Sequence, residues 1–181
     1  VAHQLPYAPA HIFDANIFAP APNTLAYSEH FVAQAVQVLP IYAVTGNAVL
    51  CYNLLYLSTF VLSGLGAFLF VRELTGSRAA GFTAGLLFAF APYRFPQSSH
   101  LQVLSSQWMP FVFFGLRRFF VTRRWRYVAL AATALVAQNL SCGYYLVYFA
   151  PFVSLHVLYE LSDRGLWRTP RVVAGVAVTA L

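Results

Sequence analysis

A few ionisable side chains in this sequence have the types and spacing to do chemistry. Only five residues are acidic, and two of them, Asp14 and Glu29, lie in the N-terminal part of the chain together with three of the five histidines. A carboxylate can take a proton as a general base, and an arginine offers a planar, permanently charged fork to phosphate oxygens. With Arg94 and the nearby His100, these residues fit a general base beside a phosphate clamp.

Two other interpretations fit the same residues. Asp14, Glu29 and histidines could bind a divalent metal, but neither an HxxxH nor an HExxH spacing is present, and the ligands would have to come from distant loops. We therefore predict no cofactor, with a divalent metal left as an alternative. The residues could also be ordinary loop polarity, which is the simpler interpretation for His3 and His11. Glycine-rich phosphate loops, Ser-His-Asp motifs and CxxC pairs are absent, so no nucleotide-binding, hydrolase or redox site is indicated.

The composition indicates that these residues belong to a membrane protein. Of the 181 residues, 60% are hydrophobic and 9% are charged, whereas ordinary soluble domains have about 25% charged residues. These few polar side chains could not cover a soluble domain of this size, and the mean hydropathy of +0.64 agrees. All 11 basic residues are arginine and the net charge is +6. We interpret this charge as a signal of membrane orientation, and we expect no nucleic-acid partner.

The apolar stretches predict an all-α fold, a polytopic bundle of transmembrane helices. The segment from residue 48 to 71 is the clearest, because at ~1.5 Å per residue it is long enough to cross a bilayer. The next segment is shorter and carries Gly81 and Gly85, a pair of small residues that lets two helices approach closely. The predicted membrane-spanning segments are residues 48–71, 79–92, 101–116, 127–137, 144–159 and 172–181, the last of them truncated.

The arginines predict the orientation of these segments. If residues 48–71 cross inward and each later segment crosses in turn, ten of the eleven arginines fall on the cytoplasmic side, as the positive-inside bias requires. Arg94 is then the one arginine outside. Residues 1–47 would lie on the periplasmic side of a bacterial inner membrane. Three acids are expected to solvate the cytoplasmic loops, namely Glu73, Glu160 and Asp163.

The N-terminal stretch is expected to be a loop with one amphipathic helix lying along the membrane. Prolines prevent a long helix in its first part. Ser28 is a suitable N-cap for a helix over about residues 29–39, which Pro40 would end. Its polar stripe either faces water or a cavity, or packs on neighbouring helices. That stripe consists of His30, Gln34 and Gln37.

Three stretches of the sequence resemble the GT-C superfamily of polytopic membrane glycosyltransferases, related to the protein O-mannosyltransferases and the aminoarabinose transferase. They are residues 11–30 (HIFDANIFAPAPNTLAYSEH), 71–81 (VRELTGSRAAG) and 88–111 (FAFAPYRFPQSSHLQVLSSQWMPF). The resemblance covers about residues 10–160. In such enzymes the first outer loop follows a first membrane helix and carries a catalytic aspartate, and Asp14 occupies that place. The resemblance therefore implies that this chain is a fragment, preceded by another span.

The resemblance also implies a reaction at the cell envelope. A sugar would be transferred from a polyprenyl-phosphate donor to an acceptor, with Asp14 as the general base. Arg94 and His100 would hold the departing phosphate, while Glu29 and His30 would position the sugar or Asp14. Gln102 would line the same cavity.

Two competing functions use the same architecture. A multi-span transporter or flippase would place ionisable groups at the bilayer midplane, and the centres of the predicted spans contain none. A non-catalytic membrane scaffold is the other alternative.

Overall fold

The computed structural model describes residues 1, 3–15, 17–27 and 29–180, and in this part every regular element is a helix. The all-α prediction is therefore confirmed. Three short 3-10 helices lie at Pro9–His11, Thr24–Tyr27 and Pro92–Arg94. The α-helices are α1 (Val32–Thr45), α2 (Ala48–Thr75), α3 (Arg78–Ala89), α4 (Leu101–Leu104), α5 (Met109–Thr122), α6 (Trp125–Ser141), α7 (Tyr144–Asp163) and α8 (Pro170–Ala180).

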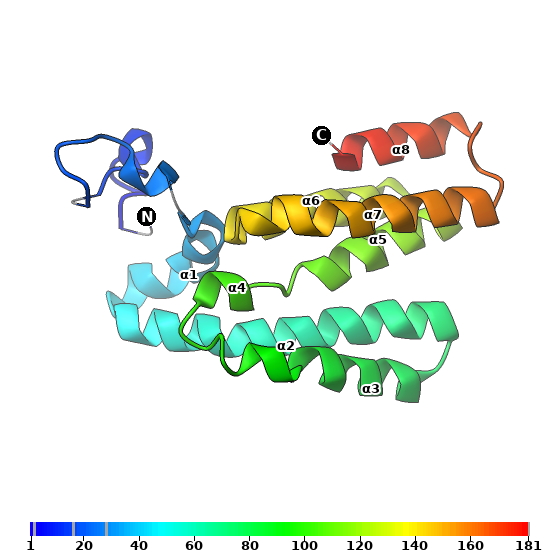
Figure 1. Ribbon diagram of the computed structural model, residues 1–181, viewed down its shortest axis with the longest axis horizontal. Helices are drawn as coiled ribbons and strands as arrows, with labels where there is room; N and C mark the ends of the chain where they lie inside the picture. Colours follow the sequence, from blue (N-terminus) through cyan, green and yellow to red (C-terminus); the bar gives the residue numbers. More distant parts are fainter. Residues whose placement is uncertain (2, 16, 28, 181) are drawn as a thin grey trace.

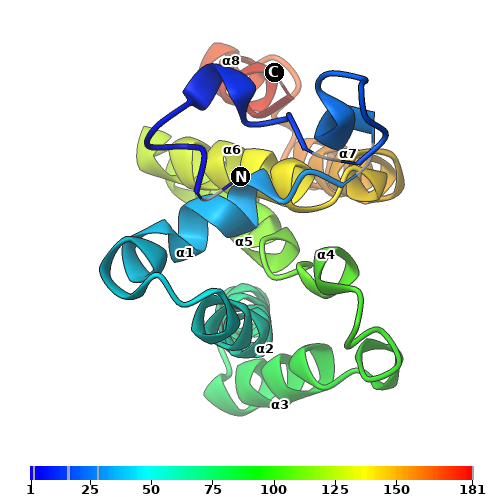
Figure 2. The ribbon, with the colours of Figure 1, turned by 90° about the vertical axis from the view of Figure 1, so that its left-hand side faces the viewer.

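The long helices run side by side along the longest axis of the molecule (Figure 1). The pair α2 and α3 forms one layer, the helices α5, α6 and α7 form a second, and α8 lies on α6. The N-terminal segment, α1 and α4 gather at one end, which Figure 2 views directly. The turns after α2, α5 and α7 lie at the other end (Figure 1).

Membrane-crossing character is clearest in α2. Among the described residues, it is the one helix that is both long and apolar enough to cross a membrane. Residues 32–45 and 170–179 form shorter apolar helices. A polytopic arrangement therefore remains a proposal, which we take up below.

Residues 101–116, predicted as one membrane-spanning segment, form two helices in the structure. Helix α4 ends at Leu104 and α5 begins at Met109. Pro110 lacks an N–H and fits best in the first turn of a helix, which is the position that it occupies in α5. The four residues of the break, 105–108, are not helical.

The predicted end of the first helix at Pro40 is wrong. Helix α1 continues through this proline to Thr45 and ends at Gly46, which adopts a left-handed conformation with φ of 60°. Residues on both sides of the proline, Val38 and Ile41, pack into one apolar cluster with α2. This packing offsets the single hydrogen bond that a proline removes. The predicted N-cap, Ser28, lies outside the described residues.

The polar stripe of α1 packs on neighbouring helices. Gln34 is buried and its Nε2 donates to the carbonyl oxygen of Ser141 at 2.8 Å. Gln37 Nε2 donates to Ser58 Oγ at 2.7 Å. These two glutamines therefore fix helix α1 to α6 and to α2.

Glycines allow α2 and α3 to approach closely, as the sequence predicts. A Cβ atom added to Gly85 would lie 2.7 Å from the carbonyl oxygen of Gly64, and one added to Gly81 would lie 2.8 Å from that of Phe68. Both distances are too short for a carbon atom, so only glycine fits without a backbone shift.

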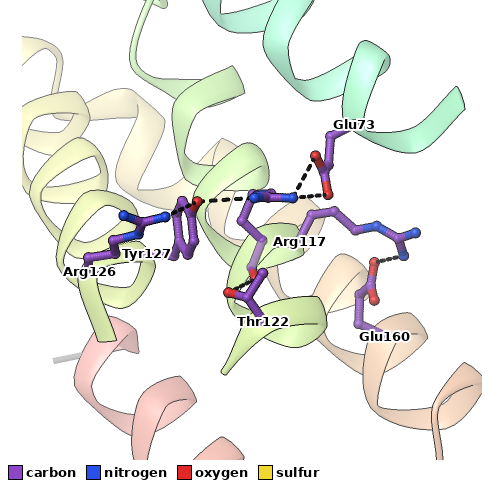
Figure 3. Close-up of polar contacts among 7 residues, drawn as sticks. Glu73, Arg117, Thr122, Arg126, Tyr127 and Glu160 are labelled. Carbon is purple, nitrogen blue, oxygen red and sulfur yellow. Dashed lines mark hydrogen bonds and ion pairs between the residues drawn. The ribbon is translucent and has the colours of Figure 1, made fainter. Parts of the chain in front are cut away.

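Two ion-pair networks hold the arginine-rich end together (Figure 3). Arg118 Nη1 donates to the carboxylate of Glu73 at 3.0 Å and links α5 to α2. Glu160 on α7 accepts from Arg117 at 2.7 Å and from Arg164 at 2.6 Å. Its side chain has no solvent exposure. The prediction that this acid solvates a loop is therefore wrong for Glu160, because Arg117 on α5 and Arg164 at the end of α7 enclose it.

The close contact of α2 and α3 generates a prediction. Gly85→Ala should lower the free energy of unfolding by about 1–3 kcal/mol, because the new methyl group overpacks the contact with Gly64. Gly143→Ala is the matched control, since a Cβ there meets no atom within 4 Å and φ is −62°. Thermal unfolding of the purified proteins measures both effects. Equal stability of the two variants would contradict close packing at Gly85.

Candidate functional site

The end of the bundle seen in Figure 2 holds the predicted site residues of the N-terminal segment. Asp14 lies in a loop whose backbone it fixes. The N–H of Asn23 donates to its Oδ1 at 2.7 Å, and the Nδ1 of His11 lies 2.8 Å from its Oδ2. The bond from the Asn23 amide, followed by the bond from His11, lowers the pKa of Asp14. The side chain is 39% exposed, so a substrate hydroxyl could still reach the carboxylate.

Glu29 ties the N-terminal segment to the turn between α6 and α7. Its Oε2 accepts from the N–H of Gly143 at 3.2 Å, and its Oε1 lies 3.7 Å from Cys142 Sγ. Burial, followed by the charge of Glu29, raises the pKa of the Cys142 thiol to about 11. The thiol therefore stays protonated and donates to the carboxylate. Cys142 and Cys51 are both buried and free.

A cavity of about 460 Å³ lies between the N-terminal segment, α1, α2 and α4. Glu29, His30 and Gln34 supply polar atoms to its wall. The Oε1 of Gln34 is buried and has no partner in the described part of the chain. The ring of His30 packs edge-on against Phe13, the residue before Asp14, with 5.8 Å between centroids. The structure thus brings Glu29 and His30 to one cavity and places the Asp14 loop against its rim.

Arg94 is fully buried, which differs from the exposed cation that the orientation argument suggests. Its Nη1 donates to Ser106 Oγ at 2.7 Å and its Nη2 donates to Thr59 Oγ1 at 3.3 Å. The guanidinium lies over the ring of Phe60, 4.9 Å from the centroid. Within the described residues no carboxylate pairs with it. Its neighbours are therefore neutral hydroxyls and an aromatic face.

The helix break between α4 and α5 supplies further buried polar groups beside Arg94. Ser105, Ser106 and Gln107 are all buried. Gln138 on α6 donates to the carbonyl oxygen of Ser105 at 2.9 Å. Both amide atoms of Gln107 and the Nε of Arg94 find no partner in the part of the chain that the structure describes. We refer to these residues together as the Arg94 cluster: Arg94, Thr59, Ser105, Ser106, Gln107 and Gln138.

An unpaired buried guanidinium costs several kcal/mol, and groups left without hydrogen bonds in an apolar interior add to this cost. An anion that bonds to these donors would offset both costs. The Arg94 cluster therefore has the chemistry of an anion site. Sequence reasoning missed this burial, although one signal was present in the run of polar residues SSQ inside an otherwise apolar segment.

His100 and Gln102 lie near the start of α4. His100 is exposed, and its Nδ1 is 3.3 Å from Ser99 Oγ. Gln102 is half-buried on α4. No hydrogen bond joins either residue to Arg94 among the described residues, so the structure does not assemble the predicted pair of Arg94 and His100. The last turn of α6 contacts both regions, since its Ser141 accepts from Gln34 in the cavity wall and its Gln138 donates to Ser105 of the Arg94 cluster.

Comparisons with known proteins give no match. No protein-family model, no curated protein and no solved structure matches the chain. No group of three or more His, Cys, Asp or Glu side chains in residues 1, 3–15, 17–27 and 29–180 is arranged to hold a metal ion. The resemblance to the GT-C superfamily therefore stays a prediction.

The contacts of Asp14 generate a second prediction. Asp14→Ala should increase hydrogen exchange of the Asn23 amide several-fold, because the variant loses the acceptor of that N–H. In the parent protein the bond to the carboxylate should persist below the usual pKa range of aspartate, and should weaken only as the pH falls through the lowered pKa. Exchange followed by mass spectrometry measures this, with the exposed Asp163→Ala as control. Unchanged exchange in Asp14→Ala would show that the loop does not depend on the carboxylate.

Proposed function

We propose that the protein is a multi-span membrane glycosyltransferase that transfers a sugar from a polyprenyl-phosphate donor. The reaction takes place at the end of the bundle that holds Asp14, Glu29 and the Arg94 cluster. The observation that carries this proposal is Arg94, a buried cation at the end opposite the other arginines, with no acidic partner among the residues that the structure describes. A phosphate is the anion whose oxygens best match its planar fork.

The distribution of charged and apolar side chains supports a membrane location. Ion pairs join the C-terminal ends of α2, α5 and α7. This is expected if these three helices cross in one direction and α3 and α6 cross in the opposite direction between them. Non-helical backbone at membrane depth requires burial in protein, and the break at Ser105 and Ser106 is buried. Large apolar side chains project outward along three helices; examples are Leu57 and Val61 on α2, Phe82 and Leu87 on α3, and Val147 and Leu155 on α7.

A groove between α2 and α3 supports a lipid-linked donor. It has a volume of about 440 Å³, and apolar residues line it from Phe60 and Phe90 to Phe68 and Phe82. Phe60 is also the ring over which the guanidinium of Arg94 lies. A polyprenyl chain in this groove would therefore bring its phosphate close to Arg94. Binding requires that Arg94 exchange its hydroxyl partners for phosphate oxygens.

The proposed reaction is a displacement at the anomeric carbon of the sugar. Asp14 takes the proton of the acceptor hydroxyl, the acceptor oxygen bonds to the anomeric carbon, and the bond from that carbon to the donor phosphate breaks. The phosphate leaves with the bonding electrons, and Arg94 stabilises its charge. Glu29 and His30 line the cavity that would take the sugar. Glu29 is the alternative base, because it lies in the cavity wall.

A lipid flippase is the second candidate function, and one observation favours it. Binding sites of transporters are often built where a membrane helix is broken, and α4 and α5 are separated at the Arg94 cluster. The two functions differ in their product, since a flippase moves the lipid-linked sugar without cleaving it.

The proposed orientation predicts opposite labelling of two exposed positions. A cysteine at Ser98 should react with an impermeant thiol reagent applied from the periplasmic side, and a cysteine at Ser162 should react only after the membrane is permeabilised. Both residues are exposed, so access depends on the side of the membrane. The native Cys51 and Cys142 are buried and serve as the unreactive background. Reaction of both positions in intact cells would refute the orientation.

The proposed reaction predicts how two substitutions separate chemistry from donor binding. Asp14→Asn should reduce transfer by about 10²–10⁴-fold, the usual effect of losing a general base, while donor binding persists. Arg94→Lys should raise the KM for the donor roughly tenfold, since the charge remains but the fork is lost. Transfer of labelled sugar from a polyprenyl-phosphate donor measures both, with Glu73→Gln as a control expected to stay near the parent rate.

Each variant can fail in a way that changes the assignment. If Asp14→Asn transfers as fast as the parent, Asp14 is a loop residue and Glu29 is the base to test. If Arg94→Lys keeps the parental KM, the phosphate binds elsewhere. Movement of intact donor across the membrane without transfer would favour the flippase.

A further inference from the structure

The arginine-rich end of the bundle contains more partly buried positive charge than its acids neutralise. Glu160 accepts from Arg117 through Oε1 and from Arg164 through Oε2, so both carboxylate oxygens are occupied. Figure 3 shows Arg117 reaching from its helix to Glu160, with Glu73 engaged separately. The carboxylate neutralises one of these two guanidinium groups.

A third arginine lies beside this pair. Arg123 stands in the turn between α5 and α6 with φ of 58°. Burial, followed by the charge of Arg164, lowers the pKa of Arg123, and the charge of Glu160 acts in the opposite direction. The side chain of Arg123 makes no hydrogen bond among the described residues, and its Nη1 is buried without a partner. Two guanidinium groups therefore share the carboxylate of Glu160, and Arg123 adds a third positive charge near them without bonding to it.

Other acids do not complete the charge balance. Glu73 pairs with Arg118, and Asp163 is exposed and forms no ion pair in the described part of the chain. The Nε of Arg117 is also buried and unpartnered. Like charges held close together with unused donors favour binding of an anion. We refer to Arg117, Arg123, Arg164 and Glu160 as the Glu160 cluster.

The surroundings indicate where the anion comes from. Trp125 and Trp167 are exposed at this end of the bundle, and tryptophans are enriched at the level of lipid headgroups. Arg124 and Arg168, next to these tryptophans, are exposed as well. Basic pockets between helix ends at a membrane surface bind anionic headgroups. A soluble phosphate, by contrast, has no apolar part that could contact the apolar surface around the site.

We propose that the Glu160 cluster binds the phosphate headgroup of an anionic membrane lipid. Arg117 and Arg164 supply the guanidinium nitrogens that Glu160 leaves free, and Arg123 supplies a guanidinium that has no partner in the described part of the chain. The lipid lies in the leaflet opposite the proposed transfer site. This inference needs the membrane location but does not depend on the transfer reaction, the donor or Asp14.

The test measures binding of a short-chain phosphatidic acid to the purified full chain in detergent by native mass spectrometry. Arg123→Asn should weaken this binding roughly tenfold, because a hydrogen bond to a charged group is worth about that factor. Asparagine tolerates the left-handed backbone at this position. Arg78→Gln is the matched control, since Arg78 is exposed at the same end but outside the Glu160 cluster, and it should bind as the parent does.

A second variant and two competing ligands complete the test. Arg164→Gln should weaken binding to a similar extent, and thermal unfolding establishes that each variant is folded. If Arg164→Gln does not fold, Arg123→Asn decides alone, because Arg123 makes no side-chain hydrogen bond to lose among the described residues. Equal binding of phosphatidylcholine, equal binding by Arg123→Asn, or displacement of the lipid by an equal concentration of inorganic phosphate would each overturn the proposal.

Discussion

The high cost of burying charge in an apolar bundle determines where this chain places its few ionisable residues. A charge in a low-dielectric interior must be paired with an opposite charge, hydrogen-bonded by neutral polar groups, or placed at an end of the bundle. Glu160 follows the first rule through two arginines, and Arg94 follows the second through hydroxyl groups and an aromatic face. The remaining arginines follow the third. The two ends of the bundle therefore differ in chemistry, and the proposed functions of both ends depend on this difference.

The sequence was a good guide to features that depend on neighbouring residues. Helical character, the clearest apolar segment and the glycine contact at Gly85 follow from local composition and spacing, and the structure agrees. The effect of Pro40 was harder to predict, because it depends on what surrounds the proline. Pro110 lies in the first turn of α5, whereas Pro40 lies within α1 because apolar residues on both sides of it pack on α2.

The candidate site could be predicted only in part, because its contacts join distant parts of the chain. Arg94 bonds to Thr59, and Gln34 bonds to Ser141, which is 107 residues away. No local pattern reveals such partners, so the sequence could identify Arg94 as a candidate residue but could not show that it is buried. Asp14 is the reverse case, since its partner His11 is three residues away, yet the lowered pKa depends mainly on the amide of Asn23. That amide is a backbone group, which residue types do not reveal.

The bond between Glu29 and Gly143 has a consequence for biosynthesis. Residues 29 and 143 are separated by 114 positions, so the N-terminal segment leaves the ribosome long before its docking partner exists. The same delay applies to Gln34 and Ser141. At ~5–20 residues per second, synthesis of the intervening chain takes several seconds or more. During this interval α1 can pack on α2 and on Leu101, and the contact of Glu29 with Gly143 forms only afterwards.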